Sequence, residues 1–566
     1  MTPLLDIRNL KVDFNREGIT TTAVRNISFS LHSGKITAIV GESGSGKSIT
    51  ALSLLNLLPA NAILGGEIMY TRNGTEPVNI LSMPAKDLMN TRGKEIAMIF
   101  QEPMTSLNPV LTCGEQIIET LRRHLDISKK EALSKTIELF TEVELPQPAG
   151  IVNRYPHQLS GGQKQRVMIA MAMCCQPALL IADEPTTALD VRTQKSIVDL
   201  IKKLQQKNGM SVLFISHDLG LVADIADELL VMYQGNIVEQ GPASTVLNKP
   251  VHPYTKALLA CRPAVNSKGN KLPVLEDFIA GDATTPKPLP IQQVPVAGSE
   301  TVLSVQDLSV HFKHRKQFFG TQPAITMAVD KVSFDVKQHE IVGIVGESGS
   351  GKTTLGRAIL QLVKPSAGKI ILNGTDLNKL SPGELRKIRK NIQIVFQDPF
   401  GSLNPRLSIG EAIMEPLEVH RLYTGQKERK EKAISLLQQV QLPSDVFNRY
   451  PHQFSGGQRQ RICIARALAS DPRFLIFDES VSALDVSVQA HVINLINDLR
   501  QSGHFTAIFI SHDLSVVHYL CDRILVMKQG KIIESGTSDE VYHHPKEGYT
   551  RELIAAIAGK KMQGVQ

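Results

Sequence analysis

Two glycine-rich segments carry the residues most suited to chemistry. Gly41–Ser48 reads GESGSGKS and Gly346–Thr353 reads GESGSGKT. The first follows a short apolar run and precedes a segment whose apolar residues have helical spacing, and the second has the same setting. Strand, GxxxxGK[ST] and helix form the context that confirms a phosphate-binding loop. Its backbone N–H groups converge on phosphate oxygens at the start of a helix.

The side chains of these loops extend the phosphate chemistry. Lys47 and Lys352 bring positive charge to the β- and γ-phosphates, while the hydroxyls of Ser48 and Thr353 suit Mg²⁺. The predicted nucleotide-binding residues of the loops are Gly41, Ser43, Gly44, Ser45, Gly46, Lys47 and Ser48, then Gly346, Ser348, Gly349, Ser350, Gly351, Lys352, Thr353 and Thr354.

Adjacent acidic residues follow two later apolar runs. ALLIAD ends at Asp183 and RFLIFD ends at Asp478, so each aspartate is expected at the carboxyl edge of a sheet, facing a phosphate-binding loop. There it can orient Mg²⁺ or its waters. Glu184 and Glu479 come next and can polarise an attacking water, which predicts a catalytic role.

Two amide and two imidazole side chains complete these sets. Gln101 and Gln397 can touch both Mg²⁺ and the water, and His217 and His512 can donate to the γ-phosphate. A lone histidine after a strand is more often structural, but here it recurs in a fixed order of motifs. The predicted metal ligands are Ser48, Gln101, Asp183, Thr353, Gln397 and Asp478.

A second phosphate grip is indicated by SGGQ before a long apolar helix. Serine and two glycines at a helix start expose N–H groups and the positive end of the helix dipole. Two grips on one phosphate group within one domain would be redundant, so the pattern suggests a site shared between domains. The predicted residues are Ser160, Gly161, Gly162 and Gln163, then Ser455, Gly456, Gly457 and Gln458.

All of these motifs occur twice, in one order and roughly 300 residues apart. The chain is therefore predicted to be a duplicated domain: residues 1–262, a Pro-rich linker over 263–301, and residues 302–566.

The elements that position the motifs predict an α/β fold. Alternating apolar residues indicate antiparallel strands, and short apolar runs indicate a buried parallel sheet. Between Gln101 and Ser160 the pattern becomes helical, which predicts an inserted helical subdomain. The expected elements of the first copy are antiparallel strands at Leu4–Phe14 and Ile27–Leu31, parallel strands at Lys35–Val40, Ala178–Asp183 and Ser211–Ser216, and a helix at Ser48–Leu58.

Composition fits several globular domains. The 566 residues are 42% hydrophobic and 21% charged, and the net charge of +7 is too small to indicate nucleic acid. The longest apolar run, Val167–Cys175, is far shorter than the roughly 20 residues that span a bilayer, and it is expected to be a buried helix. No signal segment is recognisable, so a cytosolic chain is expected. The six cysteines lack metal-ligand spacing and are expected to be reduced and buried.

Taken together, the motifs resemble the ATP-binding-cassette (ABC) transporter ATPases over nearly the full chain. SLNP, RYPHQ and HPYTKALL are similar to the dipeptide, oligopeptide and nickel importer subfamily, including its tandem ATPases for glutathione and for microcin C-type peptides. The resemblance implies two tandem P-loop NTPase domains, each with a RecA-like α/β core, an antiparallel β subdomain and a helical subdomain. It also implies two ATP sites, each completed by the other domain's SGGQ.

The resemblance further implies partners and a place in the cell. Two integral-membrane permease subunits and an extracytoplasmic solute-binding protein are expected, with no nucleic acid, and the chain would lie at the cytoplasmic face of the inner membrane. Both sites are predicted to hydrolyse ATP because each has its lysine, glutamate and histidine. Phe14 and Phe312 stand where the family stacks an aromatic ring on adenine, although both also suit a strand core.

Three departures and one alternative stand beside this interpretation. DESVS at Asp478–Ser482 replaces the usual DEPTS, Phe454 replaces the signature leucine, and HHPKEGYTREL replaces HPYT near the end. Only Cys261 lies where some relatives hold an iron–sulfur cluster, so none is predicted. The alternative is a twin-cassette translation factor that acts on ribosomes. Such factors carry NHLD and a charged helical linker, whereas this chain has TALD, SALD and a Pro-rich linker.

Overall fold

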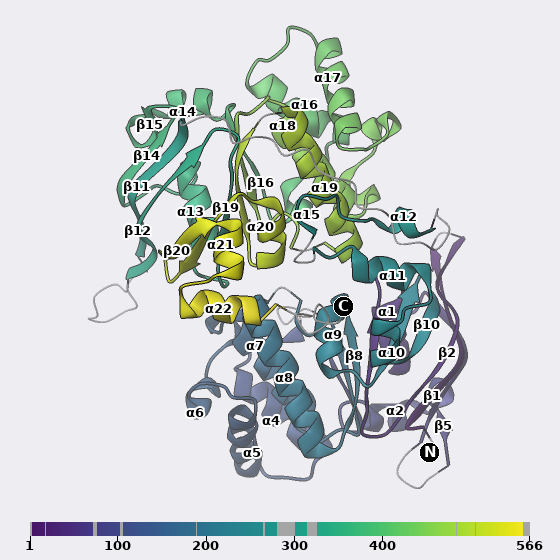
Figure 1. Ribbon diagram of the computed structural model, residues 1–566. Coiled ribbons are helices and arrows are strands. Elements are labelled where there is room, and N and C mark those ends of the chain that lie inside the picture. The colour runs from purple at the N-terminus through teal and green to yellow at the C-terminus, as the bar shows by residue number, and fades with distance from the viewer. Residues whose placement is uncertain are drawn as a thin grey trace. The chain divides into compact units, whose positions relative to one another are not determined.

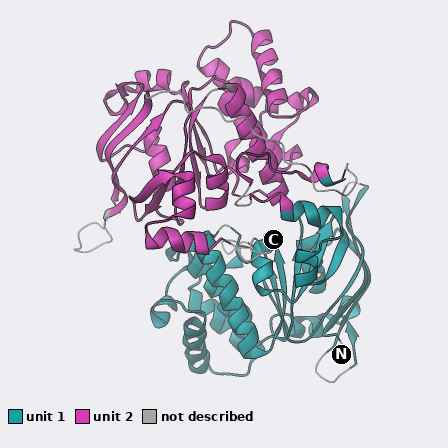
Figure 2. Ribbon diagram, viewed as in Figure 1, with its two compact units in different colours: residues 1–259, 278–284, 558–566 teal, residues 260–277, 285–557 magenta. Residues whose placement is uncertain are grey.

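The computed structural model describes residues 3–16, 18–71, 76–101, 106–187, 189–263, 267–279, 300–313, 325–482, 484–503 and 505–557. By internal contacts the chain separates into two compact units (Figure 2). The first unit contains residues 1–259 and the short segments 278–284 and 558–566, and the second unit contains residues 260–277 and 285–557. We call the two repeats the first and second cassette.

The first cassette holds two sheets, as Figure 1 shows. An antiparallel sheet has the order β2-β1-β4-β5, and a six-stranded sheet has the order β10-β9-β3-β8-β7-β6. In the larger sheet only β10 runs antiparallel to its neighbour. The strands are β1 (Leu5–Arg16), β2 (Ile19–Leu31), β3 (Ile36–Val40), β4 (Ala62–Tyr70), β5 (Val78–Asn79), β6 (Ile96–Ile99), β7 (Leu179–Asp183), β8 (Ser211–Ser216), β9 (Glu228–Tyr233) and β10 (Asn236–Pro242).

The helices of the first cassette fall into a group around the sheets and a separate helical group. In the helical group, α5 packs on α4, α6 and α7. Side-chain capping boxes start α4 at Thr112 and α5 at Ser128, which explains why helices begin there. The helices are α1 (Lys47–Leu54), α2 (Ala85–Thr91), α4 (Cys113–His124), α5 (Lys129–Glu142), α6 (Pro148–Ile151), α7 (Gly161–Met173), α8 (Val191–Asn208), α9 (Leu219–Ile225), α10 (Ala243–Asn248) and α11 (Pro253–Ala260). Helix α12 (Leu275–Ile279) follows in the segment between the two repeats.

The second cassette repeats this layout, with sheet orders β12-β11-β14-β15 and β16-β17-β18-β13-β19-β20. Its strands are β11 (Thr301–Lys313), β12 (Ile325–Lys337), β13 (Ile341–Val345), β14 (Ala367–Leu372), β15 (Thr375–Asp376), β16 (Ile392–Val395), β17 (Phe474–Asp478), β18 (Thr506–Ser511), β19 (Arg523–Lys528) and β20 (Lys531–Thr537). Its α-helices are α13 (Lys352–Ile359), α14 (Pro382–Ile388), α15 (Pro399–Ser402), α16 (Ile409–Val419), α17 (Gln426–Gln439), α18 (Gly456–Leu468), α19 (Val486–Gly503), α20 (Leu514–Leu520), α21 (Ser538–His543) and α22 (Gly548–Ala555).

The cores explain how the motifs are held. In each cassette one apolar cluster joins both sheets to the helix after the glycine-rich loop, through buried residues such as Leu54 and Leu355. All five residues of β3, β7, β13 and β17 are buried. The predicted α/β class and the antiparallel and parallel strands are therefore confirmed.

Some predicted boundaries differ from the structure. The second antiparallel strand begins at Ile19 rather than Ile27, because its exposed first half pairs with β1 as a ribbon that needs no apolar face. Helix α1 ends at Leu54 rather than Leu58, where Asn56 has a left-handed backbone. The cysteines have free thiols, and Cys175 is half-buried rather than buried. Among the described residues, no helix is both long and apolar enough to cross a membrane.

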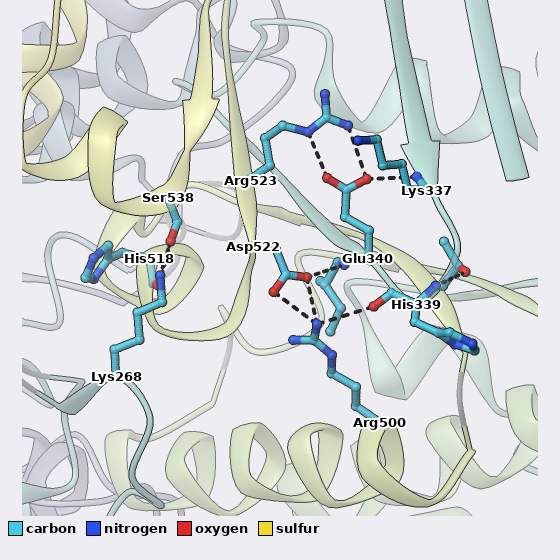
Figure 3. Close-up of polar contacts among 11 residues, drawn as sticks. Lys268, Lys337, His339, Glu340, Arg500, His518, Asp522, Arg523 and Ser538 are labelled. Atoms are coloured by element: carbon cyan, nitrogen blue, oxygen red, sulfur yellow. Dashed lines mark hydrogen bonds and ion pairs between the residues drawn. The ribbon is translucent and has the colours of Figure 1, made fainter. Parts of the chain in front are cut away.

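The predicted linker over 263–301 lies partly outside the described residues, at 264–266 and 280–299. Residues 267–277, here called the strap, pack on the second cassette. The backbone of Leu272 exchanges two hydrogen bonds with Asn494 on α19, at 3.0 and 2.8 Å. Lys271 pairs with Asp498 at 2.6 Å. Lys268 contacts Ser538 on α21, as Figure 3 shows, and also pairs with Asp539.

Helix α19, which receives the strap, is also tied to the parallel sheet. Arg500 pairs with Asp522 at 2.8 Å, and the same carboxylate accepts from the backbone of Ile341 at the start of β13. Close by, Arg523 pairs with Glu340 at 2.8 Å, as Figure 3 shows. These contacts fix the end of α19 that lies farthest from the Asp478–Glu479 pair.

Candidate active sites

Each glycine-rich loop is shaped by left-handed glycines. Gly46 and Gly351 both have φ of 104° and directly precede α1 and α13. A Cβ on Gly46 would lie 2.8 Å from the Ala23 carbonyl oxygen, and one on Gly351 would lie 2.2 Å from that of Ala328. Only glycine fits both the conformation and the space. The loops therefore have room for backbone N–H groups to gather, as the sequence predicts.

The loop lysines are buried and folded back over their own loops. Lys47 Nζ donates to the carbonyl oxygens of Gly41 and Glu42 at 2.8 and 2.9 Å. Lys352 repeats these contacts with Gly346 and Glu347, both at 2.8 Å. Each ammonium is thus held at the centre of the loop, where its charge would meet a phosphate group.

The predicted metal ligands come together as hydroxyl–carboxylate pairs. Ser48 Oγ donates to Asp183 Oδ1 at 3.0 Å, and Thr353 Oγ1 donates to Asp478 Oδ1 at 2.9 Å. Burial raises the pKa of Asp183 to about 6 and raises that of Asp478 as well. A buried carboxylate beside a hydroxyl is a hard-oxygen set, which fits Mg²⁺ and gains from its charge.

The glutamate of the first site is surrounded by the other predicted residues. The Oε2 atom of Glu184 lies 3.1 Å from Gln101 Nε2 and 3.2 Å from His217 Nδ1, and it accepts a hydrogen bond from the Thr187 hydroxyl at 2.9 Å. Lys47 Nζ lies 3.9 Å from Oε1. Glu184 has a left-handed backbone with φ of 45°, while its N–H still bonds Ile215 on β8. The turn points the carboxylate out of the sheet edge into this cluster.

The second site has the same centre. Glu479 Oε2 lies 2.9 Å from Gln397 Nε2 and 3.5 Å from His512 Nδ1, and Lys352 Nζ lies 3.8 Å from Oε1. Its φ is 48°. The third neighbour differs, because the Ser482 hydroxyl donates to the Glu479 backbone carbonyl at 2.8 Å instead of the carboxylate.

Both glutamates are held ionised. Burial alone would raise the pKa of Glu184, but the hydrogen bond and charge of His217, with Lys47, outweigh it and lower the pKa to about 2. Burial also raises the pKa of Glu479, but the hydrogen bond and charge of His512, with the charge of Lys352, outweigh burial and lower it. An ionised carboxylate at this place can accept a proton from water.

The SGGQ residues cap helices rather than join these clusters. Ser160 starts α7 in a capping box with Gln163, and Ser455 starts α18 with Gln458. The second glycine of each SGGQ faces the next long helix. A Cβ on Gly162 would lie 2.8 Å from Thr193 on α8, and one on Gly457 would lie 2.0 Å from Val488 on α19. Each N-terminus thus keeps a small, hydrogen-bonding surface.

The two phenylalanines considered for adenine stacking differ in how far they are buried. Phe14 packs partly buried against the first apolar core, whereas Phe312 is 43% exposed on β11. Two other aromatic residues escaped the sequence analysis: the hydroxyls of Tyr254 and Tyr549 accept hydrogen bonds from the glycine-rich loops. Tyr254 and Tyr549 are separated by the same interval as the later motifs of the two repeats, and this spacing is the signal that could have revealed them.

The duplicated fold and paired phosphate-loop sites define a two-cassette nucleotide-binding protein. Residues 24–187 and 329–482 match the family described as ABC transporter, and residues 238–281 match the oligopeptide/dipeptide transporter C-terminal region. The chain belongs to the ABC transporter family and is an ATPase.

Relatives match the chain over both cassettes. The glutathione import ATP-binding proteins of Escherichia coli (strain K12) and Shigella sonnei are each 48% identical over 98% of this chain and 89% of their own length. The protein of the same name from Salmonella paratyphi A is 47% identical over the same shares. These similarities extend through the segment between the cassettes.

Proposed function

We propose that this chain is the ATP-hydrolysing subunit of an importer for glutathione or similar small peptides. The observation that carries the proposal is the 48% identity, over 98% of the chain, to proteins named for glutathione import. The match of residues 238–281 to an oligopeptide/dipeptide transporter region supports the same solute class. That match does not favour the ribosome-acting alternative.

The site residues have the following roles in the proposal. Lys47, Lys352 and the loop N–H groups bind the ATP phosphates, and Glu184 and Glu479 accept a proton from the attacking water. Gln101 and Gln397 orient that water, and His217 and His512 donate to the γ-phosphate. All of these groups except the loop backbone already lie within 4 Å of a catalytic glutamate. Phe14 and Phe312 remain candidates for stacking on adenine.

Mg²⁺ belongs to this proposal because its donor set is present. Ser48 and Asp183, with Gln101, would hold one ion in the first cassette. Thr353 and Asp478, with Gln397, would hold another in the second cassette. Bound there, Mg²⁺ would neutralise phosphate charge. Closure of each site by the opposite SGGQ residues is likewise proposed. It would explain why the SGGQ helix starts keep exposed caps separate from the glutamate clusters.

Separate permease subunits would carry the solute, with a solute-binding protein outside the membrane and this chain at the cytoplasmic face. The domain limits 1–262, 263–301 and 302–566 are part of the proposal. Closure of the paired cassettes on ATP would drive the permeases, and hydrolysis would reset them.

The proposal is tested by solute uptake. Cells with the intact transport operon are compared with cells carrying Glu184→Gln and Glu479→Gln, using labelled glutathione and a set of tri- to hexapeptides. We expect uptake of glutathione or short peptides to fall to background in the double variant. Glu67→Gln, at an exposed strand position, is the control and should leave uptake unchanged. Undiminished uptake of every solute in the double variant would overturn the import assignment.

A further inference from the structure

A tyrosine reaches each glycine-rich loop from the last helices of its own cassette. The Tyr254 hydroxyl, on α11, accepts a hydrogen bond from the backbone N–H of Glu42 at 2.9 Å. The Tyr549 hydroxyl, on α22, accepts from the backbone N–H of Glu347 at 3.0 Å. The surrounding sequences differ, HPYTKALL against EGYTRELI, so the shared contact is not a by-product of general similarity.

Both tyrosines are held firmly. Tyr254 is fully buried with its ring 4.2 Å from that of Tyr233, and Tyr549 is 6% exposed under the Lys528 ammonium at 4.6 Å. Each ring therefore has little freedom to leave the loop. A buried ring packed this way can act as a fixed reference point for the backbone that it touches.

The helices that carry the tyrosines are themselves anchored by one glutamate each. Glu239 on β10 accepts from the backbone N–H groups of Val251 and His252, at 2.8 and 3.1 Å. Glu534 on β20 accepts from those of Lys546 and Glu547, at 2.7 and 3.2 Å. The departure from HPYT in the second cassette therefore leaves the anchor, the helix and the tyrosine contact in place.

The loop residue that the tyrosine holds is gripped from both sides. In the first cassette the Glu42 N–H bonds Tyr254, while the Glu42 carbonyl oxygen bonds Lys47. The second cassette repeats this at Glu347 with Tyr549 and Lys352. When the lysine turns its donors to a phosphate group, as proposed above, the tyrosine bond still holds the N–H side of this residue, while the backbone N–H of Ser45 or Ser350 still bonds its carbonyl oxygen.

We propose that Tyr254 and Tyr549 are positioning residues for ATP, which keep the start of each glycine-rich loop in its binding conformation. The inference rests on the proposed role of these loops as ATP sites. Neither hydroxyl reaches the reacting atoms in this scheme. Without the hydroxyl, a part-buried N–H loses this acceptor, and the loop must shift to find another. ATP would then bind a loop that is less well arranged.

The test uses the full chain with Glu184→Gln and Glu479→Gln as the parent, so that ATP binds without turnover. Tyr254→Phe and Tyr549→Phe remove only the hydroxyls and keep the packed rings. We expect each to weaken ATP binding at its own site by about fivefold to tenfold in a nucleotide titration, which corresponds to the net value of one hydrogen bond. The thermal midpoint without nucleotide should change little.

Tyr233→Phe is the matched control, because its hydroxyl accepts from Gln234 and sits beside Tyr254. ATP affinity should be unchanged in this variant. Unchanged affinity in both loop-facing variants would overturn the inference, and so would an equal loss in the control. A parent protein that fails to bind ATP would instead overturn the proposed function on which the inference rests.

Discussion

At the start of the parallel sheet, the first cassette pairs Lys35 with Glu228 at 3.2 Å, and the second pairs Glu340 with Arg523 at 2.8 Å. The pairs stand at equivalent positions with their charges exchanged. Opposite charges thus face each other across the same two neighbouring segments in both cassettes, and either order of the charges allows the pair to form.

The active sites show no such exchange. Lys47 and Lys352 lie 3.9 and 3.8 Å from Glu184 and Glu479, with the same sign at each place. In the proposed mechanism the lysine binds the ATP phosphates and the glutamate accepts a proton from the attacking water. Neither charge can be exchanged without loss of that role. The comparison separates residues that serve the fold from residues that serve the reaction.

The third neighbour of the glutamate differs between the two sites, unlike the lysine. Thr187 donates to the Glu184 carboxylate, whereas Ser482 donates to the Glu479 backbone. Nearby, the buried Ser480 hydroxyl has no hydrogen-bond partner within the part of the chain that the structure describes, and the first cassette has Pro185 at this position. The two sites therefore share a centre and differ at its edge, which suggests unequal rates.

The largest expected effect concerns the glutamates. The double change Glu184→Gln with Glu479→Gln should lower ATP hydrolysis by about 10²–10⁴-fold, because both proton acceptors are lost. Each single variant should keep a measurable share of turnover, as steady-state phosphate release would show. If one single variant is as inactive as the double, the two sites do not work independently.

A smaller effect is expected for the exchanged pairs. Arg523→Ala should destabilise the second cassette by about 1–3 kcal/mol, because it removes the charged partner of a carboxylate that is only 5% exposed and leaves it the Lys337 backbone N–H. Lys35→Ala should cost less than about 1 kcal/mol, since that pair is more exposed. Hydrogen exchange of the β13 and β3 amides measures each locally. Exchanging both charges, Glu340→Lys with Arg523→Glu, should restore most of the loss; no recovery would refute the charge explanation.

The smallest effect separates the third neighbours. Thr187→Ala should raise the pKa of Glu184 by removing a donor to its ionised form, yet the carboxylate should stay ionised at neutral pH. We expect kcat at the first site to fall about twofold to fivefold because the carboxylate is held less firmly in position. Ser482→Ala should leave kcat at the second site nearly unchanged. Both are measured with the other site silenced by its Glu→Gln change. Equal effects would show that the two hydroxyls do the same work.

Much of the candidate site could be predicted from the sequence because its motifs are local. A loop such as Gly41–Ser48 and a strand end such as Asp183–Glu184 carry their structural context within a few neighbouring residues. The partners that form across the fold were harder to predict. Nothing near Tyr254 in the chain points to Glu42, and the two meet only because β10 and α11 return beside the loop.

The sequence by itself determined that the protein is a duplicated α/β chain with two phosphate-binding loops, two acidic strand ends and the glutamine and histidine that accompany them. These features are repeated patterns of residue type and spacing. Tertiary structure alone decided which hydroxyl reaches the Glu184 carboxylate, which charges pair at the sheet edge, and that the strap binds α19 through Leu272 and Asn494. Such contacts join residues far apart in the chain, and only the packing of sheets and helices brings them within hydrogen-bonding distance.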